Sequence, residues 1–131
     1  MAFSSRPVID ILNKVKPPYN INQATQDLVL EALEGVDIIN EWIKATVAER
    51  EILVSKLSGL QQVEHITPSD ANFVLVKLAE PRALYSNLVE QGIIVRDRSK
   101  VELCEGCLRV TVGTKLENER LLEAIQTFYN K

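Results

Sequence analysis

Apolar side chains in the first 58 residues recur at the three- and four-residue spacing of amphipathic helices. The Pro17-Pro18 pair is expected to end the first helix, because proline cannot continue the helical hydrogen-bond ladder. The Tyr19-Asn20 pair then predicts a turn. The first helix is expected over residues 8–16, on the apolar positions Ile9, Leu12 and Val15.

Two further helices are predicted before the pattern changes. Either Asn20 or Asn22 can cap the first of them, which is expected to close at Gly35 in the left-handed conformation that glycine favours at a helix C-terminus. The second is long, over residues 37–58, and its apolar side chains cover about half of its circumference. Such an arc fits a helix with two packing partners, and equally a helix buried in a single core.

After Gly59 the pattern becomes that of short strands alternating with helices. The continuous apolar run over residues 73–78 is typical of a central strand, and Thr114 with Glu117 forms a capping box for the last helix. We therefore expect an α+β protein: a small mixed or antiparallel sheet with helices packed on one face, preceded by helices that include one long connecting helix. The expected order is strand 62–66, strand 73–78, a helix from Pro81 closed by Gly92, strand 93–96, strand 108–112 and a closing helix.

Composition narrows the class of protein. The 131 residues are 46% hydrophobic and 25% charged, which is a globular balance. A net charge of −3 with only 5% aromatic residues argues against a nucleic-acid partner. No apolar run approaches the roughly 20 residues of a membrane span, and the N-terminus lacks the apolar core of a signal peptide. A cytoplasmic protein with no membrane partner is expected.

Arg109 is the most unusual residue, because it stands in the middle of an apolar strand. Its guanidinium is always charged and presents a planar fork of donors that fits a carboxylate or a phosphate. Side chains alternate along a strand, so Arg109 shares its face with Cys107 and Thr111. Either this face is open to water, or it lines a cleft in which Arg109 holds an anion. Arg96, at the end of the preceding strand, can meet it across the sheet.

Other signs of catalytic chemistry are weak. His65 is the single histidine and lies among polar residues, which favours a surface position. Cys104 and Cys107 form one C-x-x-C, whereas a zinc site normally needs two further ligands. That pair is a weak indication of metal or redox chemistry, and its role stays open. The five glycines form no phosphate-binding loop, and no lysine stands in a setting that would desolvate it for Schiff-base chemistry.

Four segments, in order and at natural spacing, resemble the histidinol-phosphate aminotransferases, which belong to the fold-type I aminotransferases that use pyridoxal phosphate. They are residues 9–20 (IDILNKVKPPYN), 69–73 (SDANF), 92–98 (GIIVRDR) and 106–114 (GCLRVTVGT). The resemblance covers essentially the whole chain but only the C-terminal third or so of those enzymes. It implies that residues 1–35 are the end of the large-domain region with a helical linker, and residues 36–131 the C-terminal small domain.

The resemblance implies amino-group exchange between histidinol phosphate and 2-oxoglutarate or glutamate, in histidine biosynthesis. In the family, the lysine that forms the Schiff base with pyridoxal phosphate lies upstream of the matched segment. This chain is therefore expected to supply no catalytic residue, to bind no cofactor covalently and to be inactive alone. The implied partners are the rest of the aminotransferase polypeptide and, in the complete enzyme, a second identical subunit.

The resemblance implies that three residues of this chain bind the substrate. Arg109 matches the family arginine that binds the anionic end of the substrate, and Arg96 matches a second arginine at the same pocket. Asn72, followed by Phe73, matches the start of a strand near the site. Two interpretations from other classes stay open: a non-catalytic domain that binds a small anion, and an interaction domain whose long helix docks a partner.

Overall fold

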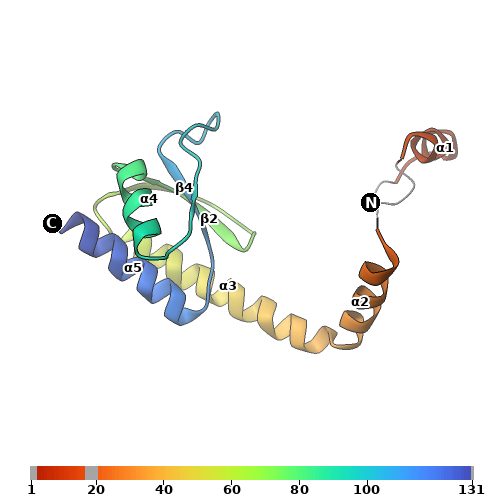
Figure 1. The fold of residues 1–131 in the computed structure, drawn as a ribbon, viewed down its shortest axis with the longest axis horizontal. Helices are drawn as coiled ribbons and strands as arrows, with labels where there is room; N and C mark the ends of the chain where they lie inside the picture. Colours follow the sequence, from red (N-terminus) through yellow and green to blue (C-terminus); the bar gives the residue numbers. More distant parts are fainter. Residues whose placement is uncertain (1–2, 17–20, 131) are drawn as a thin grey trace. The chain divides into compact units, whose positions relative to one another are not determined.

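The computed structural model describes residues 3–16 and 21–130. Within them the protein has the predicted α+β class, with five helices and one four-stranded sheet (Figure 1). The chain forms two compact units, Met1–Ile39 and Asn40–Lys131. The helices are α1 (Arg6–Val15), α2 (Gln23–Glu34), α3 (Val36–Ser58), α4 (Pro81–Glu90) and α5 (Lys115–Tyr129), and the strands are β1 (Val63–Thr67), β2 (Phe73–Leu78), β3 (Arg96–Asp97) and β4 (Cys107–Thr111).

Helices α1 and α2 of the first unit contain no buried residue. Asn22 caps α2, because its side chain accepts a hydrogen bond from the Thr25 amide at 2.8 Å. The alternative cap Asn20, the turn expected at Tyr19-Asn20 and the helix end expected at Pro17-Pro18 all lie outside the described residues. One of the two predicted caps is thus confirmed.

The prediction of a left-handed cap at Gly35 is wrong. Its φ of −100° and ψ of 25° lie outside the left-handed region. The amides of Ile38 and Ile39 donate to the Gly35 carbonyl at 3.1 and 3.3 Å, so this residue also opens α3. The chain passes directly from one helix into the next, and no left-handed turn is needed to redirect it.

The sheet has the order β1-β2-β4-β3, and all neighbouring strands are antiparallel. β2 lies between β1 and β4, as its continuous apolar run predicts. Val74 pairs with Val110 and Val76 with Leu108, and all four side chains are buried on one face of the sheet. Helices α3, α4 and α5 cover that face (Figure 1), with core residues that include Leu53, Leu57, Leu84, Leu88, Leu121, Leu122 and Ile125. We call the opposite side of the sheet the open face.

The strand expected over residues 93–96 is shorter than predicted. The Ile93 amide donates to the Leu88 carbonyl at 2.8 Å, so it continues the hydrogen bonds at the end of α4 and does not join the sheet. Gly92, with φ of +72°, makes the turn there, as glycine does without strain. Only Arg96 and Asp97 remain for β3. The apolar run over residues 93–95 predicted a strand because Val95 is buried in the core. Its backbone, however, is not part of the sheet.

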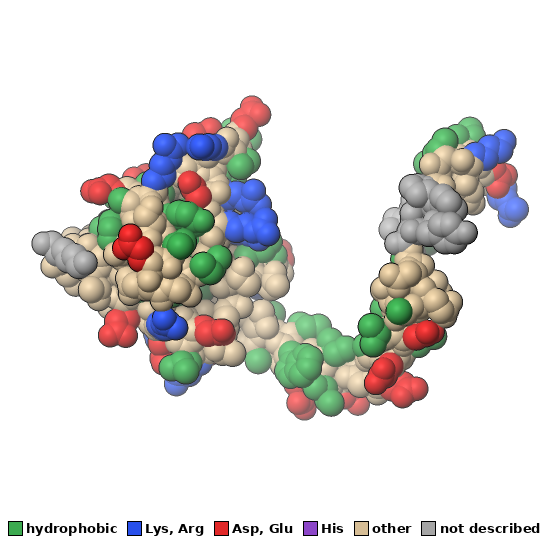
Figure 2. Space-filling model, in the orientation of Figure 1, with side chains coloured by type: hydrophobic (Ala, Val, Ile, Leu, Met, Phe, Trp, Pro, Cys, Tyr) green, Lys and Arg blue, Asp and Glu red, His purple; other side chains and the backbone are tan. Residues whose placement is uncertain are grey.

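Only the C-terminal half of α3 packs into the core, through Leu53 and Leu57. Apolar residues of its first half are exposed: Ile38 by 55%, Trp42 by 66% and Ile43 by 54%. Figure 2 shows hydrophobic side chains along this stretch. Burial of the whole helix in a single core is therefore wrong, and the second packing partner stays a prediction. No helix in the described ranges is long and apolar enough to cross a membrane.

Candidate anion-binding site

Two arginines lie directly opposite each other on the open face. Arg96 of β3 is the register partner of Arg109 of β4, so the predicted meeting of the two residues across the sheet is confirmed. Directly opposite residues of an antiparallel pair have Cβ atoms about 4.5–5.5 Å apart and point to the same side. Arg109 points away from the helices, because its strand neighbours Leu108 and Val110 are buried among them.

These two guanidinium groups have no carboxylate partner within the described residues. The ion pairs found there are Arg6–Asp10 and Lys77–Glu64, at 3.3 and 3.4 Å. The Nε atom of Arg109 is buried and has no hydrogen-bond partner in that part of the chain. Like charges placed opposite each other destabilise a sheet, and a buried donor without an acceptor costs about 1–3 kcal/mol. An anion bound between the two guanidinium groups would offset their mutual repulsion.

One aromatic ring covers the guanidinium of Arg109. Its Cζ atom lies 4.9 Å from the centroid of the Phe73 ring, within the range of about 6 Å in which a cation is attracted to an aromatic face. Phe73 pairs with Thr111, and Leu75 pairs with Arg109, so the ring lies diagonally across the β2–β4 ladder from the arginine.

Asn72 lies at the start of β2 but is not joined to the arginines. Its side chain is exposed and forms no hydrogen bond with Arg96 or Arg109 in the described structure. Its backbone carbonyl accepts from the Val112 amide at 2.9 Å, which extends the β2–β4 ladder by one bond. The structure therefore brings two of the three predicted site residues together.

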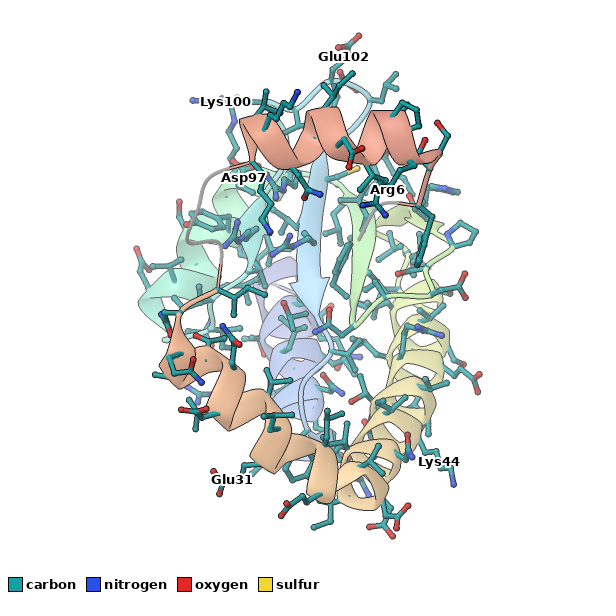
Figure 3. All side chains as sticks on the ribbon, turned by 90° about the vertical axis from the view of Figure 1, so that its right-hand side faces the viewer. Arg6, Glu31, Lys44, Asp97, Lys100 and Glu102 are labelled. Atoms are coloured by element: carbon teal, nitrogen blue, oxygen red, sulfur yellow. The ribbon has the colours of Figure 1, made fainter. Side chains whose placement is uncertain are left out.

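The neighbouring acidic residue is engaged elsewhere. Ser99, whose amide donates to the Asp97 carboxylate at 2.8 Å, holds the pKa of Asp97 below its usual range. The carboxylate is thus ionised and bound within its own loop. Lys100 and Glu102 project from the far end of this connection between β3 and β4 (Figure 3).

The two cysteines are free thiols, Cys107 buried and Cys104 half-buried. Burial raises the pKa of Cys107, and the nearby Cys104 raises it further. A raised pKa keeps Cys107 in its neutral thiol form, which is a poor nucleophile. His65 is exposed, as its polar surroundings predict, and pairs with Lys77 across the β1–β2 ladder. No group of three potential metal ligands occurs in the described segments.

Comparison with known proteins identifies the family. Residues 1–125 match the family model described as aminotransferase class I and II. The chain belongs to this aminotransferase family. A histidinol-phosphate aminotransferase from Cytophaga hutchinsonii is 47% identical over 127 residues, which are 97% of this chain and 36% of the relative. One from Flavobacterium psychrophilum is 44% identical, over 95% of this chain and 36% of the relative.

A solved structure agrees with the fold of this aminotransferase chain. The histidinol-phosphate aminotransferase from Clostridium acetobutylicum superposes with a TM-score of 0.83 at 21% identity. The match covers 95% of this chain and 38% of that one. The chain therefore spans little more than a third of the length of the relatives it matches.

Pyridoxal phosphate is the cofactor typical of this aminotransferase family, and it is held through a Schiff base to a lysine. A lysine that forms a Schiff base is normally desolvated or set beside another cation. The lysines in the described segments are all exposed: Lys14, Lys16, Lys44, Lys56, Lys77, Lys100 and Lys115. None of these lysines has the desolvated setting that a Schiff-base lysine needs.

Sequence reasoning did not assign a role to the two side chains that fix the turn before β2. The Ser69 hydroxyl accepts from the Ala71 amide at 3.1 Å and donates to the Phe73 carbonyl at 2.7 Å. Arg50 of α3 donates from Nη1 to the Ala71 carbonyl at 2.8 Å. The serine could have been found, because serine followed by small polar residues commonly forms such turns. The arginine could not, because it lies 21 residues away in the sequence.

Proposed function

We propose that this chain is the substrate-anion-binding part of a histidinol-phosphate aminotransferase. Residues 36–131 form the small domain, and residues 1–35 belong to the end of the large-domain region. The complete enzyme transfers an amino group between histidinol phosphate and 2-oxoglutarate, which becomes glutamate. Pyridoxal phosphate and its lysine are held by other parts of the polypeptide. The observation that carries this proposal is the unpaired arginine pair on the open face, in a member of this family.

The two arginines suit a site that must accept both substrates. Histidinol phosphate ends in a phosphate and glutamate in a carboxylate, and the guanidinium fork fits either group. Arg109, in the centre of its strand, is the primary clamp. Arg96, on the edge strand, offsets the additional charge of the phosphate. Charge-assisted bonds of this kind contribute about 1.5–3 kcal/mol each, and they orient the rest of the substrate for reaction.

The remainder of the aminotransferase polypeptide is the proposed partner. Exposed apolar side chains on each of the three N-terminal helices support this, because large exposed apolar surface is typical of an interaction site. They include Val8, Ile11, Leu12, Val15, Leu28, Val29, Leu33, Trp42 and Ile43. The complete enzyme is proposed to be a homodimer.

The test is a kinetic comparison in the complete enzyme that contains this chain. Arg109→Lys should lower kcat/KM about ten- to hundredfold for both substrates, because lysine loses the bidentate geometry. Arg96→Ala should lower kcat/KM for histidinol phosphate more than for glutamate. Arg120→Lys is the matched control, because Arg120 is exposed and bonds to the Gln91 carbonyl on the helical side. Parent-level efficiency of Arg109→Lys would remove Arg109 from the clamp.

A further inference from the structure

Phe73 occupies a position from which it can control the geometry of Arg109. The ring lies 4.9 Å from the guanidinium carbon, on the open face and next to the arginine pair. Leu75, the direct register partner of Arg109, supplies apolar surface but no aromatic face. Phe73 is thus the one aromatic contact of this arginine in the described part of the protein.

The backbone of Phe73 is held firmly. Its carbonyl accepts from the Ser69 hydroxyl at 2.7 Å. The preceding residue, Asn72, is tied to β4 through the Val112 amide at 2.9 Å. Arg50 holds the Ala71 carbonyl at 2.8 Å. Three elements, α3, β4 and the turn itself, therefore fix the point from which the ring extends.

We infer that Phe73 is a positioning residue, which holds the Arg109 guanidinium in an orientation ready to receive the anion. This inference rests on the proposed function of Arg109. A ring stacked on a guanidinium covers one planar face and leaves the in-plane N–H groups free to donate. Those N–H groups are the ones that bind a carboxylate or phosphate in bidentate geometry.

The physical gain comes from order present before the ligand arrives. A free arginine side chain loses rotamer freedom when it binds, and this loss weakens binding by about two- to tenfold for each ordered side chain. The buried Nε, which has no acceptor in the described residues, indicates that the Arg109 side chain is already packed down against the sheet. The Phe73 ring is the contact that keeps it there.

NMR of the 131-residue chain tests this with two readouts. The first is the order parameter of the Arg109 Nε–Hε group from ¹⁵N relaxation, assigned by its loss in Arg109→Lys. The second is the dissociation constant for inorganic phosphate, from the shift of the same resonance. Phe73→Leu and Phe73→Met remove the ring but keep an apolar side chain, whereas Phe73→Tyr keeps the ring. Leu75→Met is the matched control on the same strand and face.

Phe73→Leu and Phe73→Met should each lower the order parameter and weaken phosphate binding about two- to tenfold, with Phe73→Tyr and Leu75→Met near the parent. Parent-level order and affinity in both ring-removing variants would overturn the role of Phe73. Equal loss in Phe73→Tyr would also overturn it, because the ring would then not be the cause. If phosphate leaves the parent resonance unshifted, the proposed anion site fails, and the order parameters still decide whether Phe73 positions Arg109.

Discussion

Asn118 is the one polar residue of the described chain that is buried, with 5% of its surface exposed. Its Oδ1 accepts from the Gly113 amide at 3.0 Å, and its Nδ2 donates to the Gly113 carbonyl and to Glu49 Oε2, both at 3.1 Å. The side chain therefore joins the turn after β4 to the long helix α3. We expect Asn118→Ala to loosen this connection.

The size of the effect follows from the three hydrogen bonds. A neutral bond contributes about 0.5–1.5 kcal/mol and a bond to a charged group about 1.5–3 kcal/mol. The expected loss is smaller than the sum of these three contributions, because Glu49 is half-buried and water can replace its lost partner. We expect Asn118→Ala to lower the free energy of unfolding by about 2–4 kcal/mol, which is a large part of the stability of a domain of this size.

Urea denaturation followed by circular dichroism measures the loss of stability, and hydrogen exchange at the Gly113 amide reports the local bond. Asn87→Ala is the matched control, because Asn87 accepts an exposed helix-surface bond from Gln91 at 2.7 Å. It should change stability by less than about 0.5 kcal/mol. A loss below about 1 kcal/mol for Asn118→Ala, with unchanged exchange of the Gly113 amide, would refute the reasoning.

Three further predictions concern ionisable groups. Tyr129→Phe removes a hydrogen bond to a backbone carbonyl and should cost about 1 kcal/mol below pH 10. Burial raises the pKa of Tyr129, so the contribution of this bond to stability declines as the pH rises through that pKa. The free energies of unfolding of parent and variant, measured by urea denaturation, should therefore converge at that pH. Hydrogen bonds from the Thr114 amide and, to a smaller extent, from its hydroxyl lower the pKa of Glu117. Thr114→Ala should therefore raise the pKa of Glu117 in a ¹³C NMR titration, and an unchanged pKa would exclude the hydroxyl as a cause. Iodoacetamide at pH 8 should alkylate Cys104 before Cys107, as judged by peptide mass spectrometry, and the reverse order would contradict the burial of Cys107.

Local patterns in the sequence predicted most of the elements of the fold. The capping box of α5 is present, with Glu117 bonded to the Thr114 amide at 2.8 Å. Alternation in β4 correctly placed Arg109 on the face opposite its neighbours Leu108 and Val110, which are buried in the core. These features depend on neighbours within a few residues, which is why sequence reasoning reached them.

Features that depend on distant contacts were not predicted. The bond between Asn118 and Glu49 joins residues 69 apart in the sequence. Phe73 and Arg109 are 36 residues apart in the sequence, and their approach depends on the register between β2 and β4. A shift of that register by one residue would place the ring on the other face of the sheet. The shortening of β3 depends on where the bonds of α4 end, at Ile93.

The two edges of the sheet differ from its centre in a way that affects aggregation. β3 is only two residues long and carries Arg96, so it leaves few free amides for another strand to join. β1 has an irregular register between Val63 and His65, next to the charged Glu64. Short, charged or bulged edges are the devices by which β-proteins prevent strand addition. Association of this chain with any other polypeptide should therefore proceed through side-chain surfaces and not by extension of the sheet.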